Sequence, residues 1–394
     1  MRPKIHFIAN SVFSTTLTGG DIHFLNLAEA VVQAGYDLNF FGGHALAELI
    51  AEHKLPATIT LTDEAKIPKP NQGKLSGQFH LFQDFHRRYR RIMRLLDRIG
   101  ADDIVYAVSD YWFDVIPAVR CPARRKLMIF HMESPNLGQV IKRSRPDVDL
   151  LRLASLHFWA SQSWSLLNFA RCKNKHLIYL HPLMEPRLDR LGIGQNERTL
   201  VSYGLDVAAA DAVRAQTRVY DVVWIGRVHR QKGVDDLLAT LAHLARRLEN
   251  FRAVFIGNVR DRLLPRVREL GLENNVTFSG FVSEEEKIRL FKSSRVFLMP
   301  SKYEGSPRVI GESIVAVTPV VAYDIPNYRP LFGDYARYVP AFDLAAFQAA
   351  AECEIQNMRA GNNYLEKMPL AEFKRENLWQ TTQEKFLKAI ATHG

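Results

Sequence analysis

Short apolar segments alternate with amphipathic helical patterns along the whole chain, and this rhythm constrains the fold more than any other feature. Apolar segments without polar alternation are typical of parallel strands that are buried on both faces. Helices between such strands cover the two faces of the sheet. The sequence therefore predicts an α/β fold.

The rhythm runs through the chain twice. In the first half, we expect strands at residues 4–9, 37–42, 104–107, 126–130, 157–160 and 176–180, with a helix over 21–34. In the second half, we expect strands at 220–225, 252–256, 276–279, 296–299 and 319–322, with helices at 234–248 and 284–292. Because 394 residues exceed one ordinary hydrophobic core, we expect two Rossmann-like, doubly wound domains in tandem.

The domain boundary is expected where the apolar periodicity weakens into small and polar residues, over 205–219. We place the first domain at residues 1–206, a linker at 207–219 and the second domain at 220–376. Ligands of open α/β sheets bind beyond the carboxyl ends of the strands. The chemistry is therefore expected in a central cleft that the two domains face.

Composition narrows the class of protein. Hydrophobic residues make up 47% and charged residues 24%, as in soluble globular proteins. The three cysteines are far apart, without metal-ligand spacing, and the apolar run 5–9 is too short for a signal peptide. We expect a reduced, cytoplasmic protein. The net charge of +10 suits an anionic partner: a nucleotide, a lipid phosphate, a membrane surface or nucleic acid.

The first candidate motif directly follows the expected strand 220–225. Gly226 permits a tight turn at the strand end, and Arg227 and Lys232 then stand on the loop above the sheet edge. Two cations there would neutralise a diphosphate, with Arg as a fork and Lys as a mobile point charge. The alternative interpretation is a solvated basic loop.

The second candidate motif follows the expected strand 296–299. Glu304 and Glu312 are eight positions apart, and a helix that begins near Ser306 would place both beside its N-terminus. Free N–H groups there suit a phosphate, and carboxylates accept hydrogen bonds from sugar hydroxyls. Taken singly, each residue is equally well an ordinary loop or surface glutamate.

Taken together, the two motifs are specific. GRVHRQKG at 226–233, NNVTFSGFVSEEEKIRLFKSS at 274–294 and VFLMPSKYEGSPRVIGESIVAVTPVVAYD at 296–324 resemble the donor-binding half of the family-4 retaining glycosyltransferases, also called glycosyl transferases group 1. The resemblance covers about residues 222–324. It implies the GT-B fold, in which a terminal helix, here 377–394, crosses back to the N-terminal domain.

The resemblance also implies roles for single residues. Arg227 and Lys232 correspond to the residues that grip the donor diphosphate, Glu304 to the one that holds the transferred sugar, and Glu312 to the one that binds the ribose. The donor would also contact the turn and the backbone between the glutamates, at Gly226, Ser306, Pro307, Arg308 and Val309. Pro307 departs from the frequent glycine and has no N–H to donate.

The first half matches the family less closely. Gly19 and Gly20 lie where the family has a glycine pair near the donor phosphate, and His131 ends a strand where similar enzymes place a histidine against the donor sugar. The alternatives are a plain turn and a structural histidine. The family element before the linker is altered here at 203–206, and 183–199 looks like an insertion.

Residues 87–98 form a basic helical pattern, with an apolar stripe on one side and arginines on another, from Arg87 to Arg98. Basic residues near an anionic bilayer contribute about 1 kcal/mol each. The pattern predicts peripheral contact with the inner face of a membrane, and its alternative is a solvated face on a helix packed against the core.

The resemblance implies an enzyme, of hexosyltransferase type, that moves a sugar from a UDP- or GDP-sugar to a sugar or lipid-linked acceptor with retention. Polysaccharide, lipopolysaccharide and glycolipid assembly are the expected settings. We expect no cofactor, no metal because no Asp-x-Asp element lies near the motifs, and no nucleic-acid partner. The rival interpretations are a nucleotide-sugar epimerase or hydrolase of the same fold, and a noncatalytic polyanion-binding protein.

Overall fold

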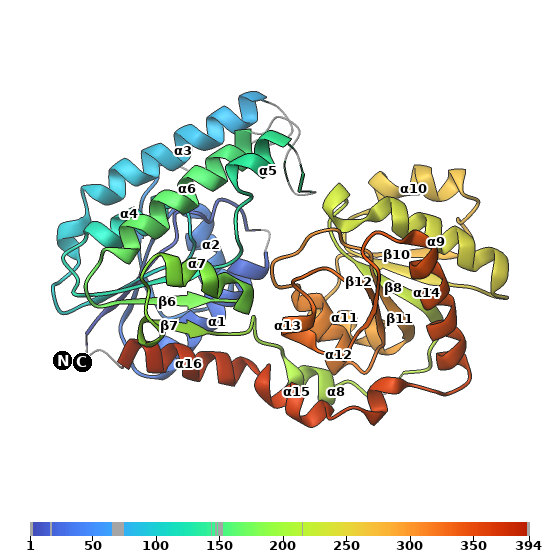
Figure 1. Ribbon diagram of the computed structural model, residues 1–394. Coiled ribbons are helices and arrows are strands. Elements are labelled where there is room, and N and C mark those ends of the chain that lie inside the picture. The colour runs from blue at the N-terminus through green and yellow to red at the C-terminus, as the bar shows by residue number, and fades with distance from the viewer. Residues whose placement is uncertain are drawn as a thin grey trace. The chain divides into compact units, whose positions relative to one another are not determined.

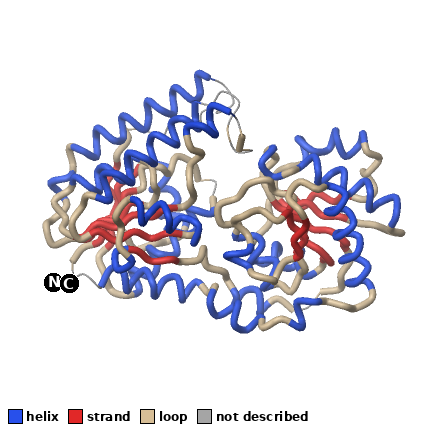
Figure 2. Tube along the Cα trace, viewed as in Figure 1, coloured by secondary structure: helices blue, strands red, loops and turns tan. Residues whose placement is uncertain are grey.

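The structure is a computed structural model that describes residues 3–15, 18–64, 75–142, 144–145, 148, 153–214 and 216–391. The chain divides into two compact units. The first comprises Met1–Ser144, Val148–Tyr203 and Trp379–Gly394, and the second comprises Arg145–Asp147 and Gly204–Leu378. Each unit has its own parallel sheet with helices around it (Figures 1 and 2).

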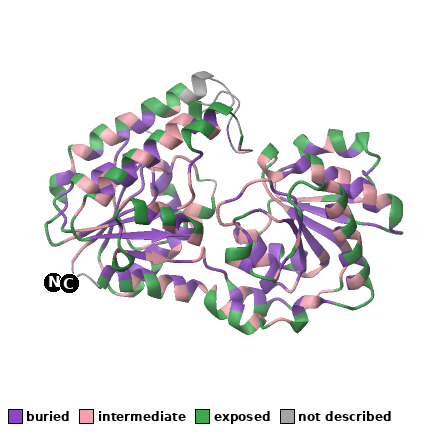
Figure 3. Cartoon of the chain, in the orientation of Figure 1, coloured by how far each residue is buried: buried purple, intermediate pink, exposed green. Residues whose placement is uncertain are grey.

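The first unit contains a seven-stranded sheet of order β3-β2-β1-β4-β5-β6-β7, in which all neighbours are parallel. Its strands are β1 (Ile5–Ile8), β2 (Leu38–Gly42), β3 (Thr58–Leu61), β4 (Ile104–Ala107), β5 (Arg125–Phe130), β6 (Lys175–Tyr179) and β7 (Arg198–Leu200). The central strands are buried along their whole length, as a sheet covered on both faces requires (Figure 3).

Helices cover both faces of this sheet and bury two separate apolar clusters. The helices are α1 (Gly19–Gln33), α2 (His44–Glu52), α3 (Leu75–Met93), α4 (Trp112–Arg120), α5 (Leu137–Lys142), α6 (Leu153–Ala170), α7 (Glu185–Arg190) and α16 (Trp379–Ala391). Short 3₁₀ turns lie at Leu96–Arg98, Pro182–Met184 and Gln195–Glu197. One cluster joins α1, α2 and α16 to the sheet, and the other joins α4, α6 and α7 to its opposite face.

The second unit contains a six-stranded parallel sheet of order β10-β9-β8-β11-β12-β13. Its strands are β8 (Tyr220–Ile225), β9 (Ala253–Ile256), β10 (Val276–Gly280), β11 (Ser294–Met299), β12 (Val320–Tyr323) and β13 (Arg337–Val339). Its helices are α8 (Val207–Ala212), α9 (Val234–Arg247), α10 (Arg260–Glu269), α11 (Glu284–Lys292), α12 (Arg308–Val315), α13 (Arg329–Phe332), α14 (Leu344–Arg359) and α15 (Leu370–Glu376), with 3₁₀ turns at Arg230–Lys232 and Tyr364–Lys367. One continuous apolar cluster fills this unit.

The strand expected at 157–160 is wrong, because these residues lie inside α6. The first turns of α6 bury polar residues: Ser155, Ser161, Gln162 and Ser165 are buried, while Phe158 and Trp159 between them are half-exposed. Ser161 accepts a hydrogen bond from the backbone N–H of Trp112 in α4, at 2.9 Å. The run that suggested a strand is therefore a partly buried turn of a helix, in which His157 accepts a hydrogen bond from Trp112 Nε1 at 3.1 Å.

Three further differences are local. The helical pattern expected over 87–98 ends at Met93 and gives way to the turn Leu96–Arg98. The segment expected as a linker contains α8, whose Val207 and Ala210 pack into the second core. The short edge strands β3, β7 and β13 were not expected, because they are only partly buried and do not form continuous apolar runs.

Candidate functional site

The candidate site lies at the carboxyl edge of the second sheet. β8 and β11 are neighbours there, and the chain continues from β8 outward to β9 and β10 but from β11 outward to β12 and β13. The strand order therefore reverses between β8 and β11, which is where ligands of open α/β sheets bind. The two sequence motifs are the loops that leave these two strand ends.

The loop after β8 is fastened to the loop after β11 by glycine and by hydrogen bonds. Gly233 has a φ of +63°, and a Cβ atom there would lie 1.9 Å from the carbonyl oxygen of Pro300, so only glycine fits. The Gln231 side chain donates to the carbonyl of Tyr303, at 2.7 Å, and the backbone carbonyl of Gln231 accepts from the N–H of Lys302, at 2.7 Å. The two loops therefore form one rigid ledge.

This ledge brings together two of the residues that the sequence singled out. Lys232 Nζ lies 2.6 Å from Glu304 Oε1, although the two are 72 positions apart. The side chains are only 18% and 9% exposed, so the ion pair is largely shielded from water. A cation and a carboxylate in contact can bind the phosphate and the hydroxyls of one ligand.

Glu312 is held by two cations. Lys287 Nζ of α11 lies 2.9 Å from its Oε1, and Arg308 Nε lies 3.1 Å from the same oxygen. Burial alone would raise the pKa of Glu312, but these two cations outweigh burial and hold its pKa below the usual value. The Glu312 carboxylate is therefore ionised at neutral pH and can only accept hydrogen bonds.

The other residues expected to bind the donor lie in the loop after β8 and at the start of α12. α12 begins at Arg308, two residues later than expected, with Pro307 as its N-cap and no side-chain cap. Ser306 and Val309 are half-buried at this helix start, and Gly226 lies in the turn after β8. Arg227 is exposed and makes no ion pair with any residue that the structure describes. Its guanidinium can therefore bind a ligand without breaking an ion pair to a described residue.

In the first unit, Gly20 and His131 lie next to each other. Gly19 and Gly20 form the first turn of α1 rather than the loop before it, and a Cβ atom on Gly20 would lie 3.5 Å from Cε1 of His131. His131 directly follows β5, and its Nε2 lies 3.2 Å from the Val108 carbonyl. Burial lowers the pKa of His131 to about 4, so its imidazole is neutral at physiological pH.

A buried polar network beside His131 was missed by the sequence reasoning. Gln162 Nε2 donates to Asp110 Oδ2 at 2.9 Å, and Gln162 Oε1 accepts from Arg187 Nη1 at 2.8 Å. Burial raises the pKa of Asp110 to about 7, against the opposing effect of these donors. Asp110 follows the expected strand 104–107 and could have been found from that place, whereas Gln162 lies just after the expected strand 157–160, inside α6.

The basic segment contributes one structural arginine. Arg88 is buried, donates to the carbonyls of Asn10 (3.0 Å) and Val12 (2.7 Å), and lies 3.2 Å from Asp63 Oδ2. Its neighbours Arg87, Arg90, Arg91, Arg94 and Arg98 are exposed. Among the described residues, no helix is long and apolar enough to cross a membrane. In the same residues, no group of three His, Cys, Asp or Glu side chains could hold a metal ion.

Part of the sequence is similar to that of known glycosyltransferases. A family model described as glycosyl transferases group 1 matches residues 210–352. Alpha-D-kanosaminyltransferase from Streptomyces kanamyceticus is 30% identical over 115 residues, which are 29% of this chain and 30% of that protein. The chain thus spans about a third or less of the length of the curated relatives it matches.

Solved structures match over nearly the whole chain. A sucrose-phosphate synthase from Thermosynechococcus elongatus superposes with a TM-score of 0.73 at 18% identity, over 99% of both chains. HepE from Anabaena in complex with UDP-glucose superposes with a TM-score of 0.67 at 16% identity, over 99% of both chains. At this identity the likeness concerns the fold, and it confirms the predicted GT-B fold of two parallel α/β domains.

Proposed function

Residues 210–352 belong to the glycosyl transferases group 1 family, and from this premise we propose that the chain is a glycosyltransferase that moves a sugar from a nucleotide diphosphate sugar to an acceptor. The observation that carries the proposal is the Lys232–Glu304 ion pair beside the start of α12, where the strand order reverses. Cation, carboxylate and free helix N–H groups meet at one edge there.

The donor would be held in three parts. Its diphosphate binds Lys232 and Arg227 and approaches the N–H groups at the start of α12, close to Gly226. Glu304 accepts hydrogen bonds from the hydroxyls of the transferred sugar. Glu312, kept ionised by its two cations, accepts those of the ribose. The backbone of residues 306–309 completes the contact.

Catalysis would rest on charge stabilisation. As the glycosidic bond breaks, negative charge grows on the diphosphate and positive charge on the sugar, and cations already in place stabilise the leaving group. The acceptor would attack from the leaving group's own face, with retention at the anomeric carbon. Glu304 would orient the sugar rather than form a covalent bond. Because Arg227, Lys232 and the helix start supply the positive charge, we expect hexosyl transfer without a metal or other cofactor.

The first unit would supply the rest of the site. Gly19 and Gly20 would lie near the donor phosphate, where a side chain would collide with it, and His131 would contact the transferred sugar. A neutral imidazole accepts or donates one hydrogen bond without adding charge, which suits an uncharged sugar. The acceptor, a sugar or a lipid-linked sugar, would bind this unit, as in polysaccharide, lipopolysaccharide or glycolipid assembly.

The exposed side of α3 supports a peripheral membrane site on the cytoplasmic side. Phe79 and Phe82 are 61% and 47% exposed, and Trp164 of α6 is 42% exposed. Phe79 and Phe82 lie on α3 together with exposed arginines of residues 87–98, and Phe82 contacts His157 of α6. Cosedimentation should be stronger with vesicles that contain anionic lipid than with neutral ones. Equal recovery with both, or none, would leave only the solvated face of a packed helix.

The test of the main proposal is a two-step assay. Thermal stabilisation by UDP-, GDP- and ADP-sugars identifies the donor, and we expect a UDP-sugar first because HepE, which shares the fold, was solved with UDP-glucose. A ligand at 100 times its dissociation constant adds about 2.7 kcal/mol. Product analysis with that donor then decides the reaction: transferred sugar supports the proposal, whereas epimerised or free sugar alone identifies an epimerase or hydrolase. Salt-dependent nucleic-acid binding without any turnover would identify a polyanion-binding protein.

A further inference from the structure

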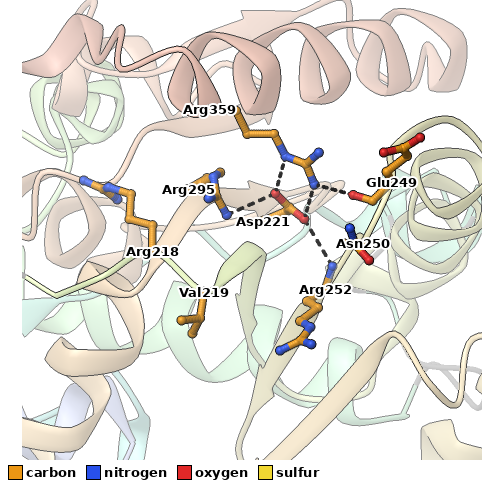
Figure 4. Close-up of a pocket in the computed structure, with 8 residues that line it drawn as sticks. All are labelled: Arg218, Val219, Asp221, Glu249, Asn250, Arg252, Arg295 and Arg359. Atoms are coloured by element: carbon orange, nitrogen blue, oxygen red, sulfur yellow. Dashed lines mark hydrogen bonds and ion pairs between the residues drawn. The ribbon is translucent and has the colours of Figure 1, made fainter.

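A second charged cavity lies at the amino edge of the second sheet, at the other end of the strands from the candidate site. It has a volume of about 440 Å³ and is lined by residues that enter β8, precede β9, begin β11 and end α14. Four of them are arginines (Figure 4): Arg218, Arg252, Arg295 and Arg359. β8 rises about 3.3 Å per residue between this cavity and the loop that carries Lys232, so the two sites are separate.

The carboxylate of Asp221 accepts hydrogen bonds from two of these arginines. This residue of β8 is 1% exposed, and its carboxylate accepts two hydrogen bonds from Arg359, at 2.9 and 2.8 Å. It also accepts from Arg295 Nη1 at 3.2 Å and from the backbone N–H of Arg252 at 3.1 Å. Four donors thus saturate one carboxylate (Figure 4), and the guanidinium groups of Arg295 and Arg359 are fixed before any ligand binds.

Two donors of this cluster are not used by the protein. The exposed guanidinium of Arg252 makes no ion pair with any described residue. The Nε atom of Arg295 is buried and, within the described part of the chain, has no hydrogen-bond partner. A buried N–H without an acceptor is rare in folded proteins and calls for an explanation, such as a bound ion or water. Both residues are part of the lining of the same cavity.

The net charge of the lining is positive, because it contains four arginines and only two carboxylates, those of Asp221 and Glu249. We propose that this cavity binds a phosphate group, free or carried by a small sugar, with the phosphate against Arg252 and Arg295. Guanidinium forks match the oxygens of a phosphate. The exposed side chains of Glu249 and Asn250 are on the rim and can hydrogen-bond sugar hydroxyls. The volume falls in the range of small-molecule sites.

Calorimetric titration of the full chain with inorganic phosphate, glucose 6-phosphate and glucose tests this proposal. We expect both phosphates to bind and glucose not to bind. Tighter binding of glucose 6-phosphate identifies the phosphorylated sugar as the ligand, and equal affinity identifies free phosphate. The absence of binding by either phosphate at millimolar concentrations overturns the proposal.

Variants locate the binding. Arg252→Ala removes an exposed side chain and should weaken phosphate binding about tenfold or more, the usual effect of one charge-assisted hydrogen bond. Arg268→Ala removes an exposed arginine of α10 outside the lining and should change nothing. Arg295→Lys keeps the charge but removes Nε, and should weaken binding in a protein that circular dichroism shows to be folded. Unchanged affinity in both Arg252→Ala and Arg295→Lys contradicts the site.

Lys232→Ala separates this site from the candidate donor site. Phosphate binding at the amino edge should persist in that variant, whatever the outcome of the transferase assay. If Lys232→Ala abolishes the phosphate titration, the binding belongs to the carboxyl edge and the inference fails.

Discussion

The carboxyl edges of the two sheets hold polar groups in opposite ways. In the second unit, charged side chains meet in ion pairs, with Lys232 on Glu304 and two cations on Glu312. In the first unit, burial moves titratable groups toward their neutral forms: it raises the pKa of Asp110 to about 7 and lowers that of His131 to about 4. The charged groups of the second edge are ionised and paired, whereas Asp110 and His131 of the first edge are close to neutral.

The difference indicates which ligand each edge can accept. When an ionised ligand binds at an ion pair, the ligand can replace one partner of the pair. No buried charge is then left unpaired, and an unpaired buried charge would be strongly destabilising. A neutral network of hydrogen bonds instead fits hydroxyl groups, because neither partner loses hydration of a charge. We therefore expect variants of the second edge to change phosphate-dependent steps. Variants of the first edge should change the dependence of stability on pH.

The largest effect is expected from Lys232→Ala, which removes a preorganised cation from the proposed diphosphate site. Loss of one such contact costs about 3–4 kcal/mol, or about 100- to 1000-fold in kcat. Lys302→Ala is the matched control, because Lys302 lies on the same ledge but pairs with Asp236, 3.2 Å away. Steady-state kinetics with the identified donor compare them. A folded Lys232→Ala variant with the normal rate would refute the diphosphate role.

A smaller effect is expected from Glu304→Gln, which keeps the shape of the side chain but removes its charge. A hydrogen bond to a charged group contributes about 1.5–3 kcal/mol, so we expect sugar transfer to slow by about 10- to 100-fold. Because Glu304 is proposed to orient the sugar, the loss should fall on kcat while UDP binding stays nearly unchanged. A variant that loses UDP affinity but not kcat would assign Glu304 to the nucleotide instead.

The fold could be read from the sequence because both sheets are parallel and buried. Such strands are continuous apolar runs, and the expected strands 104–107 and 220–225 coincide with β4 and β8. The failure at 157–160 has the same origin, since a short apolar run inside a helix looks like a buried strand. Length and periodicity of the run cannot separate the two cases.

The sequence predicts the candidate site only where residues close together in the chain form it. The strand ends put Lys232 and Glu304 on adjacent loops, and the reversal of strand order makes these loops meet. Lys287, which pairs with Glu312, comes from the separate helix α11, and no spacing relates the two. The pKa of Asp110 is raised by burial, and burial is a property of the folded chain that the neighbouring residues in the sequence do not reveal.

Asp110→Asn tests the neutral edge. A folded pKa of about 7 lies above the unfolded value of about 3.9, so the folded state binds the proton more tightly. Stability from this carboxyl is present below about pH 4 and is lost as pH rises through 7. Three pKa units correspond to about 4 kcal/mol, and we expect about half of this because the surroundings relax on ionisation.

Urea unfolding at pH 5 and pH 8 measures this effect. The wild type should lose stability between the two values. Because about two of the three pKa units lie between pH 5 and pH 8, Asp110→Asn should lose about 1 kcal/mol less. The control is Asp102→Asn, which changes an exposed carboxyl and should follow the wild type. If Asp110→Asn also follows the wild type, Asp110 is ionised in the folded protein and the first edge is not neutral.

The smallest effect is expected from Glu312→Gln, and it has the opposite sign. Lys287 and Arg308 hold the folded pKa of Glu312 below its usual value, against the effect of burial. Its contribution to stability is therefore present above the unfolded pKa of about 4.3 and lost as pH falls through the folded pKa. Glu312→Gln should be less stable than the wild type at pH 7, by about 1 kcal/mol, and the difference should shrink in acid.

Glu285→Gln provides the reference, because the pair that Glu285 makes with Arg289 is exposed and contributes little. Urea unfolding of the three proteins at pH 7 and pH 4 gives the comparison. If Glu312→Gln is as stable as the wild type at pH 7, burial cancels the two cations. The second edge is then no more strongly ionised than the first, and the contrast between the edges would rest on the Lys232–Glu304 pair alone.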